Sequence, residues 1–407
     1  MAASLLSHVV SDLCIGRPRV LTLPPSTPVA AALAALRAGA DPFAFVDAEP
    51  PTYRAKRGAP PPTVYAKVTA ADILCYVCGD AGNLGDPAAA LGRPVSAVTA
   101  AVSAGVTHRV DPQTRLLDAI DVLLTDGCQG LLVPLHARAR KRHHHHQSLP
   151  SSDAAADCCV LTREDIVRHL FGSVSHFSPV AALTVASLGL VRRDAAVHAV
   201  HADDDGLDAI PPLRRALSDG TAVAVLADDG ALLGEICPGV LASCDVESVS
   251  GAFAALSAGD VMTYIDCSVS HTPPEFLLRA IRAQLKGRGL NAIAELMDTA
   301  HAAASLPLST SSSSSTSSDE DSSSGRGRRP RRMSSGSFRW RSTEEVVACH
   351  SGSSLVAVMA QALAHRVGYV WVVDEASGAL VGVVRFADVL AVLREHLRPQ
   401  SHQALCR

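Results

Sequence analysis

The apolar residues of the chain follow one pattern that returns four times. A short run of β-branched and aliphatic residues is followed, after a polar or small residue, by a stretch with apolar positions at helical spacing. These runs occupy residues 64–74, 158–167, 232–241 and 380–390. Because a repeated pattern marks a repeated supersecondary unit, the sequence predicts four copies of one strand-and-helix unit.

Two further elements precede each run in the same order. The first is a helix, predicted at residues 28–37, 116–125 and 354–365 and interrupted near Pro211 and Pro212 in the third copy. The second is a short, almost wholly apolar strand, predicted at residues 43–47, 131–135, 222–226 and 369–374. Each copy therefore has the order helix, strand, strand, helix. Strands without polar alternation are usually buried on both faces, so we expect helices to cover these sheets.

The second strand of the first two copies ends in a threonine that is followed three residues later by an aspartate. These pairs are Thr69 with Asp72 and Thr162 with Asp165. An aspartate in the first turn of a helix is favoured by the helix dipole and can accept hydrogen bonds from both hydroxyls of a ribose. The threonine hydroxyl and the free amides of the helix start can face a phosphate. The same pair is also an ordinary helix cap, worth about 1 kcal/mol without any ligand, so both interpretations stay open.

Together, the order of elements, the Asp228-Asp229-Gly230 turn and the Thr-x-x-Asp helix start resemble the CBS motif. Residues 256–262 and 359–373 carry the same likeness. The chain is similar to plant CBS-domain-containing proteins of the four-motif type. The resemblance implies an α/β (α+β) fold of tandem CBS motifs, each a small mixed sheet covered by two helices, paired into two Bateman modules.

The length of 407 residues exceeds the size at which a single core usually stops growing, which fits two modules. We expect residues 1–175 to form the first module, with loop insertions at 50–62 and 136–157, and residues 176–399 to form the second. The second module carries a helical insertion at 274–303, which either packs on the module or engages a partner. For the Ser/Arg-rich arm at 305–342, low hydrophobicity and blocks of like charge predict disorder.

The usual ligands of the CBS family are adenosine-containing molecules. The resemblance thus implies AMP, ADP, ATP or S-adenosylmethionine as a regulatory ligand rather than as a required cofactor. Carried over to this sequence, the ribose and phosphate positions fall on Thr69, Asp72, Thr162, Asp165, Asp388 and Arg385. Arg385 stands where the first two copies have a hydroxyl residue. In the third copy Cys237 and Val240 replace both residues of the pair, so we expect that half-site to be inactive.

No motif for catalysis accompanies these pairs: the sequence lacks GxxxxGK[ST], GxGxxG after a strand, HExxH and GxSxG. We therefore predict a non-enzymatic regulatory protein that binds an adenosine-containing ligand and modulates a partner protein, either a kinase or another enzyme. The resemblance extends to the γ subunits of SNF1-type kinases, which are likewise built from four CBS motifs. The alternative is a nucleotide-independent interaction scaffold with degenerate clefts. Homodimerisation is compatible with both.

The composition of the chain limits which classes of partner it can bind and in which cellular compartment we expect it. A net charge of −4 offers no general attraction to nucleic acid or anionic lipid. No apolar run reaches the roughly 18 residues of a membrane helix, and no basic segment precedes the first apolar residues. Eleven cysteines, an odd number scattered through predicted helices and strands, indicate reduced thiols. These features predict a soluble protein of the cytoplasm or the nucleus.

Two motifs raise the question of metal binding. Cys75 and Cys78 have the spacing of a zinc or redox pair, but no second CxxC accompanies them, so core packing is favoured. Four histidines, His143 to His146, lie among arginines in a polar insertion, and we interpret them as a solvated loop. We predict no metal site.

A further motif lies in the Ser/Arg-rich arm. Arg331-Arg332-Met333-Ser334 places an arginine three residues before a serine, which many basophilic kinases accept. Ser334 and Ser335 are therefore candidate phosphorylation sites, where a phosphate would add nearly two negative charges beside an arginine cluster. The alternative is a plain linker kept in solution by its charge.

Overall fold

The structure is a computed structural model that describes residues 7–39, 41–48, 64–102, 105–125, 127–135, 157–193, 197–270, 273, 275–304 and 346–397. The insertion at 50–62, the histidine run and the arm with Ser334 and Ser335 lie outside these residues.

The first two copies share one six-stranded sheet. Its strands, in spatial order, are β1 (Thr22–Leu23), β2 (Phe43–Ala48), β3 (Val64–Thr69), β4 (Val106–Arg109), β5 (Cys128–Pro134) and β6 (Cys158–Leu161). Within each copy the first pair of strands is parallel and the second is antiparallel. The copies join where β3 runs antiparallel to β4, with Ala66 opposite Val106.

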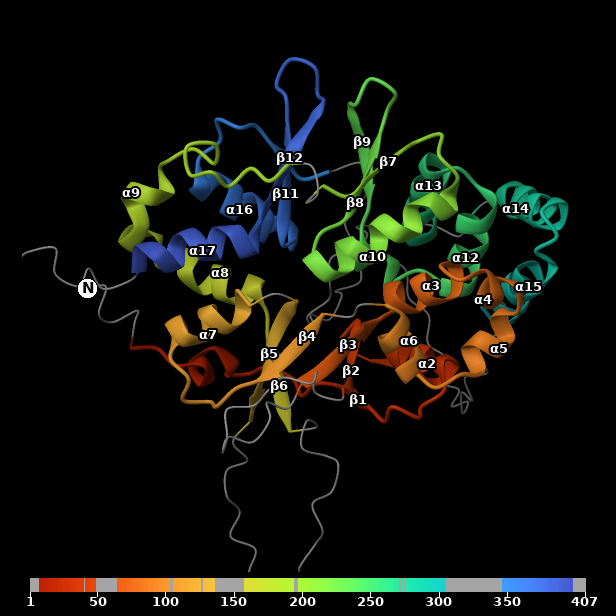
Figure 1. The fold of residues 1–407 in the computed structure, drawn as a ribbon, viewed down its shortest axis with the longest axis horizontal. Helices are drawn as coiled ribbons and strands as arrows, with labels where there is room; N and C mark the ends of the chain where they lie inside the picture. The colour runs from red at the N-terminus through yellow and green to blue at the C-terminus, as the bar shows by residue number, and fades with distance from the viewer. Residues whose placement is uncertain are drawn as a thin grey trace, which may run out of the picture.

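The third and fourth copies form one three-stranded sheet each. Their strands are β7 (Ala199–His201), β8 (Val223–Leu226) and β9 (Leu232–Ile236), then β10 (Ala348–Cys349), β11 (Tyr369–Val373) and β12 (Leu380–Arg385). The β8–β9 and β11–β12 hairpins lie side by side in Figure 1. Their turns are joined by two backbone bonds, from Leu232 N–H to the Gly378 carbonyl (3.2 Å) and from Leu380 N–H to the Gly230 carbonyl (3.0 Å).

The first helix of each copy precedes its antiparallel strand pair, and the second follows it. Copy one has α2 (Val29–Ala38) and α3 (Ala70–Cys78), copy two has α7 (Leu116–Leu123) and α8 (Arg163–Phe171), copy three has α10 (Ile210–Asp219) and α11 (Pro238–Leu241), and copy four has α16 (Leu355–His365) and α17 (Phe386–Leu397). The connecting helices are η1 (Val10–Cys14), α4 (Ala81–Gly85), α5 (Pro87–Gly92), α6 (Ser96–Ala101), η2 (Val174–Phe177), α9 (Ser178–Ala181), η4 (Gly206–Ala209), α12 (Val246–Ala255), α13 (Ala258–Ser270), α14 (Glu275–Gly287) and α15 (Asn291–Ala304). None of the described helices is both long enough and apolar enough to cross a membrane.

The structure departs from the predicted pattern in two places. Each copy begins with an additional parallel strand, β1, β4, β7 or β10, which is too short to show a hydrophobic period. The predicted interruption of the third helix near Pro211 and Pro212 is wrong. Helix α10 begins at Ile210 and both prolines lie in its first turn, where the missing N–H has no partner within the helix in any case.

Two hydrophobic cores hold the four copies together. Helix α3 of copy one packs against α10 and α12 of copy three, and α8 of copy two packs against α16 and α17 of copy four. The two halves of the chain are therefore joined by apolar contact, and Figure 1 shows the four copies arranged around a common centre.

The inserted helices α14 and α15 belong to the first of these cores. They pack on α12, and α15 also reaches α4 and α5 of copy one. Gly251 of α12 permits this approach, because a Cβ there would lie 3.0 Å from Met297 Sδ and 3.5 Å from Leu285 Cδ1. The insertion is thus packed on the module, where it ties copy three to copy one.

Replacing Leu285 by alanine tests this role of the insertion. Leu285 is fully buried, so we expect Leu285→Ala to lower the free energy of unfolding by about 2–5 kcal/mol. Phe276 on the same helix is 74% exposed, and Phe276→Ala should change the free energy by less than about 0.5 kcal/mol. Urea denaturation of both variants measures the difference. Equal stability of Leu285→Ala and wild type would show that the insertion does not contribute to the core.

Candidate functional site

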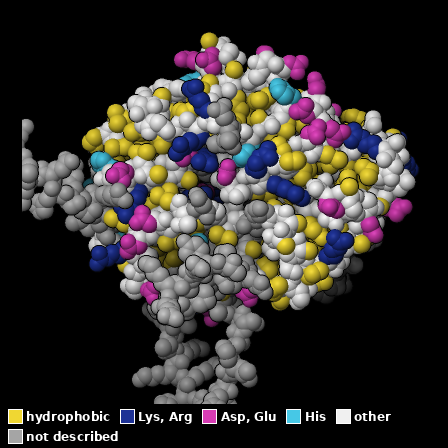
Figure 2. All heavy atoms as spheres, in the orientation of Figure 1, with side chains coloured by type: hydrophobic (Ala, Val, Ile, Leu, Met, Phe, Trp, Pro, Cys, Tyr) yellow, Lys and Arg dark blue, Asp and Glu magenta, His cyan; other side chains and the backbone are white. Residues whose placement is uncertain are grey.

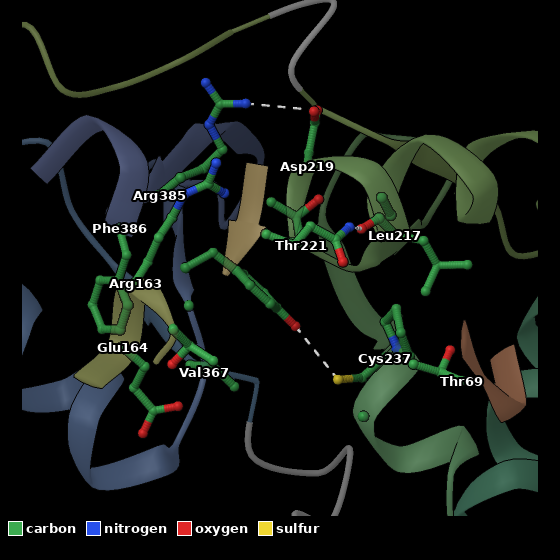
Figure 3. A pocket seen from close by; sticks show the side chains of 18 of the residues that line it. Thr69, Arg163, Glu164, Leu217, Asp219, Thr221, Cys237, Val367, Arg385 and Phe386 are labelled. Atoms are coloured by element: carbon green, nitrogen blue, oxygen red, sulfur yellow. Dashed lines mark hydrogen bonds and ion pairs between the residues drawn. The ribbon is translucent and has the colours of Figure 1, made fainter. Parts of the chain in front are cut away.

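At the centre of the four copies lies a cavity of about 320 Å³. Its wall includes Thr69, Thr162, Cys237 and Arg385, the residues that join the second strand to the second helix in copies one to four. The start of the second helix of every copy therefore faces one space. In Figure 3, Arg163, Arg385 and Glu164 lie on one side of this space, and Thr69 and Cys237 lie on the other.

The two predicted threonine–aspartate pairs form helix caps. Thr69 donates from its amide and its hydroxyl to one carboxylate oxygen of Asp72, at 2.7 and 2.6 Å. Thr162 makes the same two bonds to Asp165, at 2.7 and 2.8 Å. The threonine oxygen in turn accepts from the aspartate amide in both copies. Capping is thus present in the structure, while the position of Thr69, Asp72 and Thr162 in the cavity wall leaves them within reach of a ligand.

The remaining predicted residues separate into different surroundings. Asp165 lines a second cavity of about 340 Å³, where Arg17 donates to its carboxylate at 2.5 Å. Asp388 is 5% exposed and accepts from Arg192 at 2.8 Å and from Arg385 at 2.9 Å. Of these residues, only Arg385 lies in the wall of the central cavity. Two of the three aspartates are therefore already paired with arginines from the same chain.

At the start of its second helix, the third copy contributes an apolar part of the wall. Cys237, Pro238 and Gly239 line the cavity, and Val240 is buried. The proline has no N–H to offer to a ligand. The Tyr369 hydroxyl lies 3.7 Å from Cys237 Sγ, so this side chain is engaged with copy four.

Four basic side chains line the central cavity, and three of them were not predicted from the sequence. They are Lys67, Arg163, Arg366 and Arg385, accompanied by the acidic residues Asp72, Glu164 and Asp219. Figure 2 shows Lys and Arg side chains gathered near the middle of the described face, where the copies meet in Figure 1. Lys67 and Arg163 lie within two residues of Thr69 and Thr162 in the sequence. This proximity could have indicated that their side chains belong to the same site as the threonines.

Burial shapes the charge of the cavity on the side of copy one. The Lys67 ammonium lies 5.0 Å from the centroid of the Phe43 ring, a cation–π distance. Partial burial lowers the pKa of Lys67, and the nearby Asp72 carboxylate opposes this shift. Burial also raises the pKa of Asp72, an effect opposed by the hydrogen bonds from Thr69 and by Lys67.

On the opposite side, the arginines are held by the protein. Arg163 donates to the carbonyls of Cys128 (2.6 Å) and Leu123 (3.2 Å). Arg385 contacts Asp388 and, at 3.6 Å, Asp219. A hydrogen bond from His198 is the main reason why the pKa of Asp219 lies below its ordinary value, and Arg385 lowers it further. These contacts fix the positions of the guanidinium groups before any ligand arrives.

A buried carboxylate links the third and fourth copies beside the cavity. Glu235, 2% exposed, accepts from the Tyr369 hydroxyl (3.0 Å) and from the Trp371 indole N–H (2.6 Å). Both donors are themselves buried. The Tyr369 ring, which lines the cavity, is therefore fixed by a contact between copies.

The CxxC pair lies in the core. Cys75 and Cys78 are buried in α3, and burial raises the pKa of Cys78 to about 12 and that of Cys75 in the same direction. Both thiols are thus protonated at neutral pH, whereas zinc binds thiolates. Within the described ranges, no three His, Cys, Asp or Glu side chains are grouped so that they could hold a metal ion.

Comparison with known proteins identifies the family to which this architecture belongs. A CBS domain model matches residues 341–395. The Arabidopsis thaliana protein named CBS domain-containing protein CBSX5 is 35% identical over 98% of this chain and 99% of its own length, and CBSX6 from the same plant is 26% identical over 97% and 95%. A solved structure from Methanocaldococcus jannaschii, titled a putative archaeal homolog of g-AMPK, shares the fold with a TM-score of 0.51 at 14% identity, covering 95% of this chain and all of that one. The predicted fold is confirmed, and the chain belongs to the plant CBS-domain-containing proteins of the four-motif type.

Proposed function

We propose that this protein is a non-enzymatic regulatory protein that binds an adenosine-containing ligand in the central cavity and thereby modulates a partner protein. The observation that carries the proposal is the convergence of four basic side chains and the helix starts of all four copies on one space. Its volume of about 320 Å³ lies at the lower end of the roughly 300–1,000 Å³ that small-molecule sites occupy.

The charges of the cavity favour a phosphate group. Arg163 and Arg385 are fixed by contacts with carbonyls and carboxylates, so a bound anion would not have to order them. Partial burial lowers the pKa of Lys67, and an anion beside it would favour its charged form. Guanidinium and ammonium groups form charge-assisted hydrogen bonds with phosphate oxygens, which are stronger than neutral ones.

The aromatic residues of the wall favour a base. Phe43 of copy one and Tyr369 and Phe386 of copy four line the same cavity. Aromatic rings accept nucleobases by stacking, and this contact is tolerant of the identity of the base. The wall therefore supports a nucleoside phosphate as a class, with AMP, ADP, ATP and S-adenosylmethionine as the candidates.

The packing of the copies supports a regulatory effect. We propose residues 1–175 and 176–399 as two modules whose junction is the cavity, so a ligand there would touch both. It would act on a partner by favouring one arrangement of the modules, since equal affinity for two arrangements shifts neither. The description of the archaeal neighbour as a putative g-AMPK homolog accords with a kinase or another enzyme as the partner.

The scaffold hypothesis is favoured by a different observation. Arg17 pairs with Asp165, and Arg192 and Arg385 pair with Asp388, so these carboxylates are engaged without a ligand. If the clefts no longer bind nucleotide, a pull-down from plant extract will recover the same partners with and without adenine nucleotides. Partners that change with nucleotide exclude this hypothesis.

Lys67 offers a sharper test of ligand binding than the aspartates, because Asp72 and Asp165 also cap helices. We expect Lys67→Met to weaken the binding of AMP or ATP by about 10- to 100-fold, the equivalent of one charged hydrogen bond. Isothermal titration calorimetry with AMP, ADP, ATP and S-adenosylmethionine measures the effect. Since methionine retains the apolar stem without the desolvated charge, the melting temperature should not fall.

The matched control is Arg279→Met, which removes a cation whose side chain is 76% exposed on α14. Its affinity for each ligand should equal that of the wild type. Unchanged affinity of Lys67→Met would remove the cavity from the proposal, and a wild type that binds none of the four ligands would refute adenosine binding.

The lowered pKa of Lys67 predicts a pH dependence. A group whose pKa is lowered loses its charge at a lower pH than an ordinary lysine with a pKa of 10.5, so affinity for an anion should fall as pH rises toward the lowered value. A phosphate monoester is fully charged above about pH 7, so its own titration does not interfere there. Calorimetry at increasing pH from about 7.5 should show this decline in wild type and its absence in Lys67→Met. A parallel decline in both proteins would assign the effect to another group.

A further inference from the structure

Arg366 has an unusual backbone conformation for its residue type. It follows α16 with φ 55° and ψ 43°, in the left-handed region. Among the described residues, all the others with positive φ are glycines. For a residue with a Cβ this conformation is strained, and such strain persists only when something compensates it.

The third copy shows what this position ordinarily requires. Helix α10 ends at the equivalent place with Gly220, at φ 70° and ψ 37°. In both copies two residues separate the left-handed residue from the next strand, and the same backbone bond closes the helix. That bond runs from Thr221 N–H to the Ala216 carbonyl (2.9 Å) and from Val367 N–H to the Ala362 carbonyl (3.0 Å). Glycine adopts this geometry without strain, so copy four has an arginine where glycine would be more stable.

The Arg366 side chain does not pack in the hydrophobic core. Arg366 is exposed, while its neighbour Val367 is buried. Arg366 is therefore placed at the surface of the cavities, where its guanidinium can contact a bound ligand.

Arg366 lies where the two cavities meet. It is one of four residues that line both, together with Phe43, Thr162 and Glu164. The central cavity adds the basic residues Lys67, Arg163 and Arg385. The second cavity adds Arg17 and Arg168. Arg366 is the basic residue common to both groups.

We infer that Arg366 is an anion-binding residue that recognises a phosphate group of the ligand at the junction of the two cavities. Its planar fork of N–H donors matches two oxygens of one phosphate, which a lysine cannot do. The inference rests on the proposed function in so far as the cavities bind a ligand, but it does not require that the ligand contain adenosine.

The test uses full-length Arg366→Gly and Arg366→Lys, with inorganic pyrophosphate as the anion and adenosine as the uncharged comparison. We expect Arg366→Gly to melt several degrees higher than wild type without ligand, because the strain is relieved, and to bind pyrophosphate at least tenfold more weakly. Arg366→Lys retains the strained backbone, so its melting temperature should stay near that of wild type while its affinity is intermediate. The affinity for adenosine should not differ among the three proteins.

Three results would overturn the inference. Pyrophosphate affinity of Arg366→Gly equal to wild type would mean that the guanidinium does not bind the anion. A lower melting temperature of Arg366→Gly would mean that the arginine is retained for stability. Absence of pyrophosphate binding to wild type would exclude an anion site altogether. If wild type binds pyrophosphate but none of the adenine nucleotides, the proposed function fails, and a weakened Arg366→Gly still supports the role of Arg366.

Discussion

The architecture depends on apolar contact between copies that lie far apart in the chain. A three-stranded sheet with two helices cannot bury both of its faces, so each unit needs a neighbour. Helix α3 packs against α10 and α12, and α8 packs against α16 and α17. These contacts form two continuous hydrophobic cores. The central cavity exists because these cores hold the starts of four helices around one point. The inserted helices α14 and α15 strengthen one of the two cores and leave the other unchanged.

At that centre the structure keeps groups that do not favour stability. Lys67 is partly buried, which lowers its pKa, and Arg366 adopts a backbone conformation that suits glycine. Both lie in the wall of the cavity, whereas Glu235 forms hydrogen bonds with Tyr369 and Trp371 within the protein and links copies three and four. Strained or partly desolvated groups gathered at one site are typical of binding sites.

The four copies have diverged unequally around this centre. Copies one and two retain the threonine–aspartate cap, copy four replaces the hydroxyl by Arg385, and copy three presents Cys237. The cavity is therefore basic on the side of Arg163 and Arg385 and more apolar beside Cys237.

The sequence by itself determined the repeat, the antiparallel strand pair and the two helices of each unit, and the caps at Thr69 and Thr162, because these depend on residues only a few positions apart. It did not reveal β1, β4, β7 and β10, since strands of two to four residues carry no period and form only when a neighbouring strand is present. The tertiary structure alone decided that Lys67, Arg163 and Arg366 share a cavity and that Arg17 meets Asp165, 148 positions away. Such contacts arise from the packing of whole copies, and no local pattern encodes which surfaces will meet.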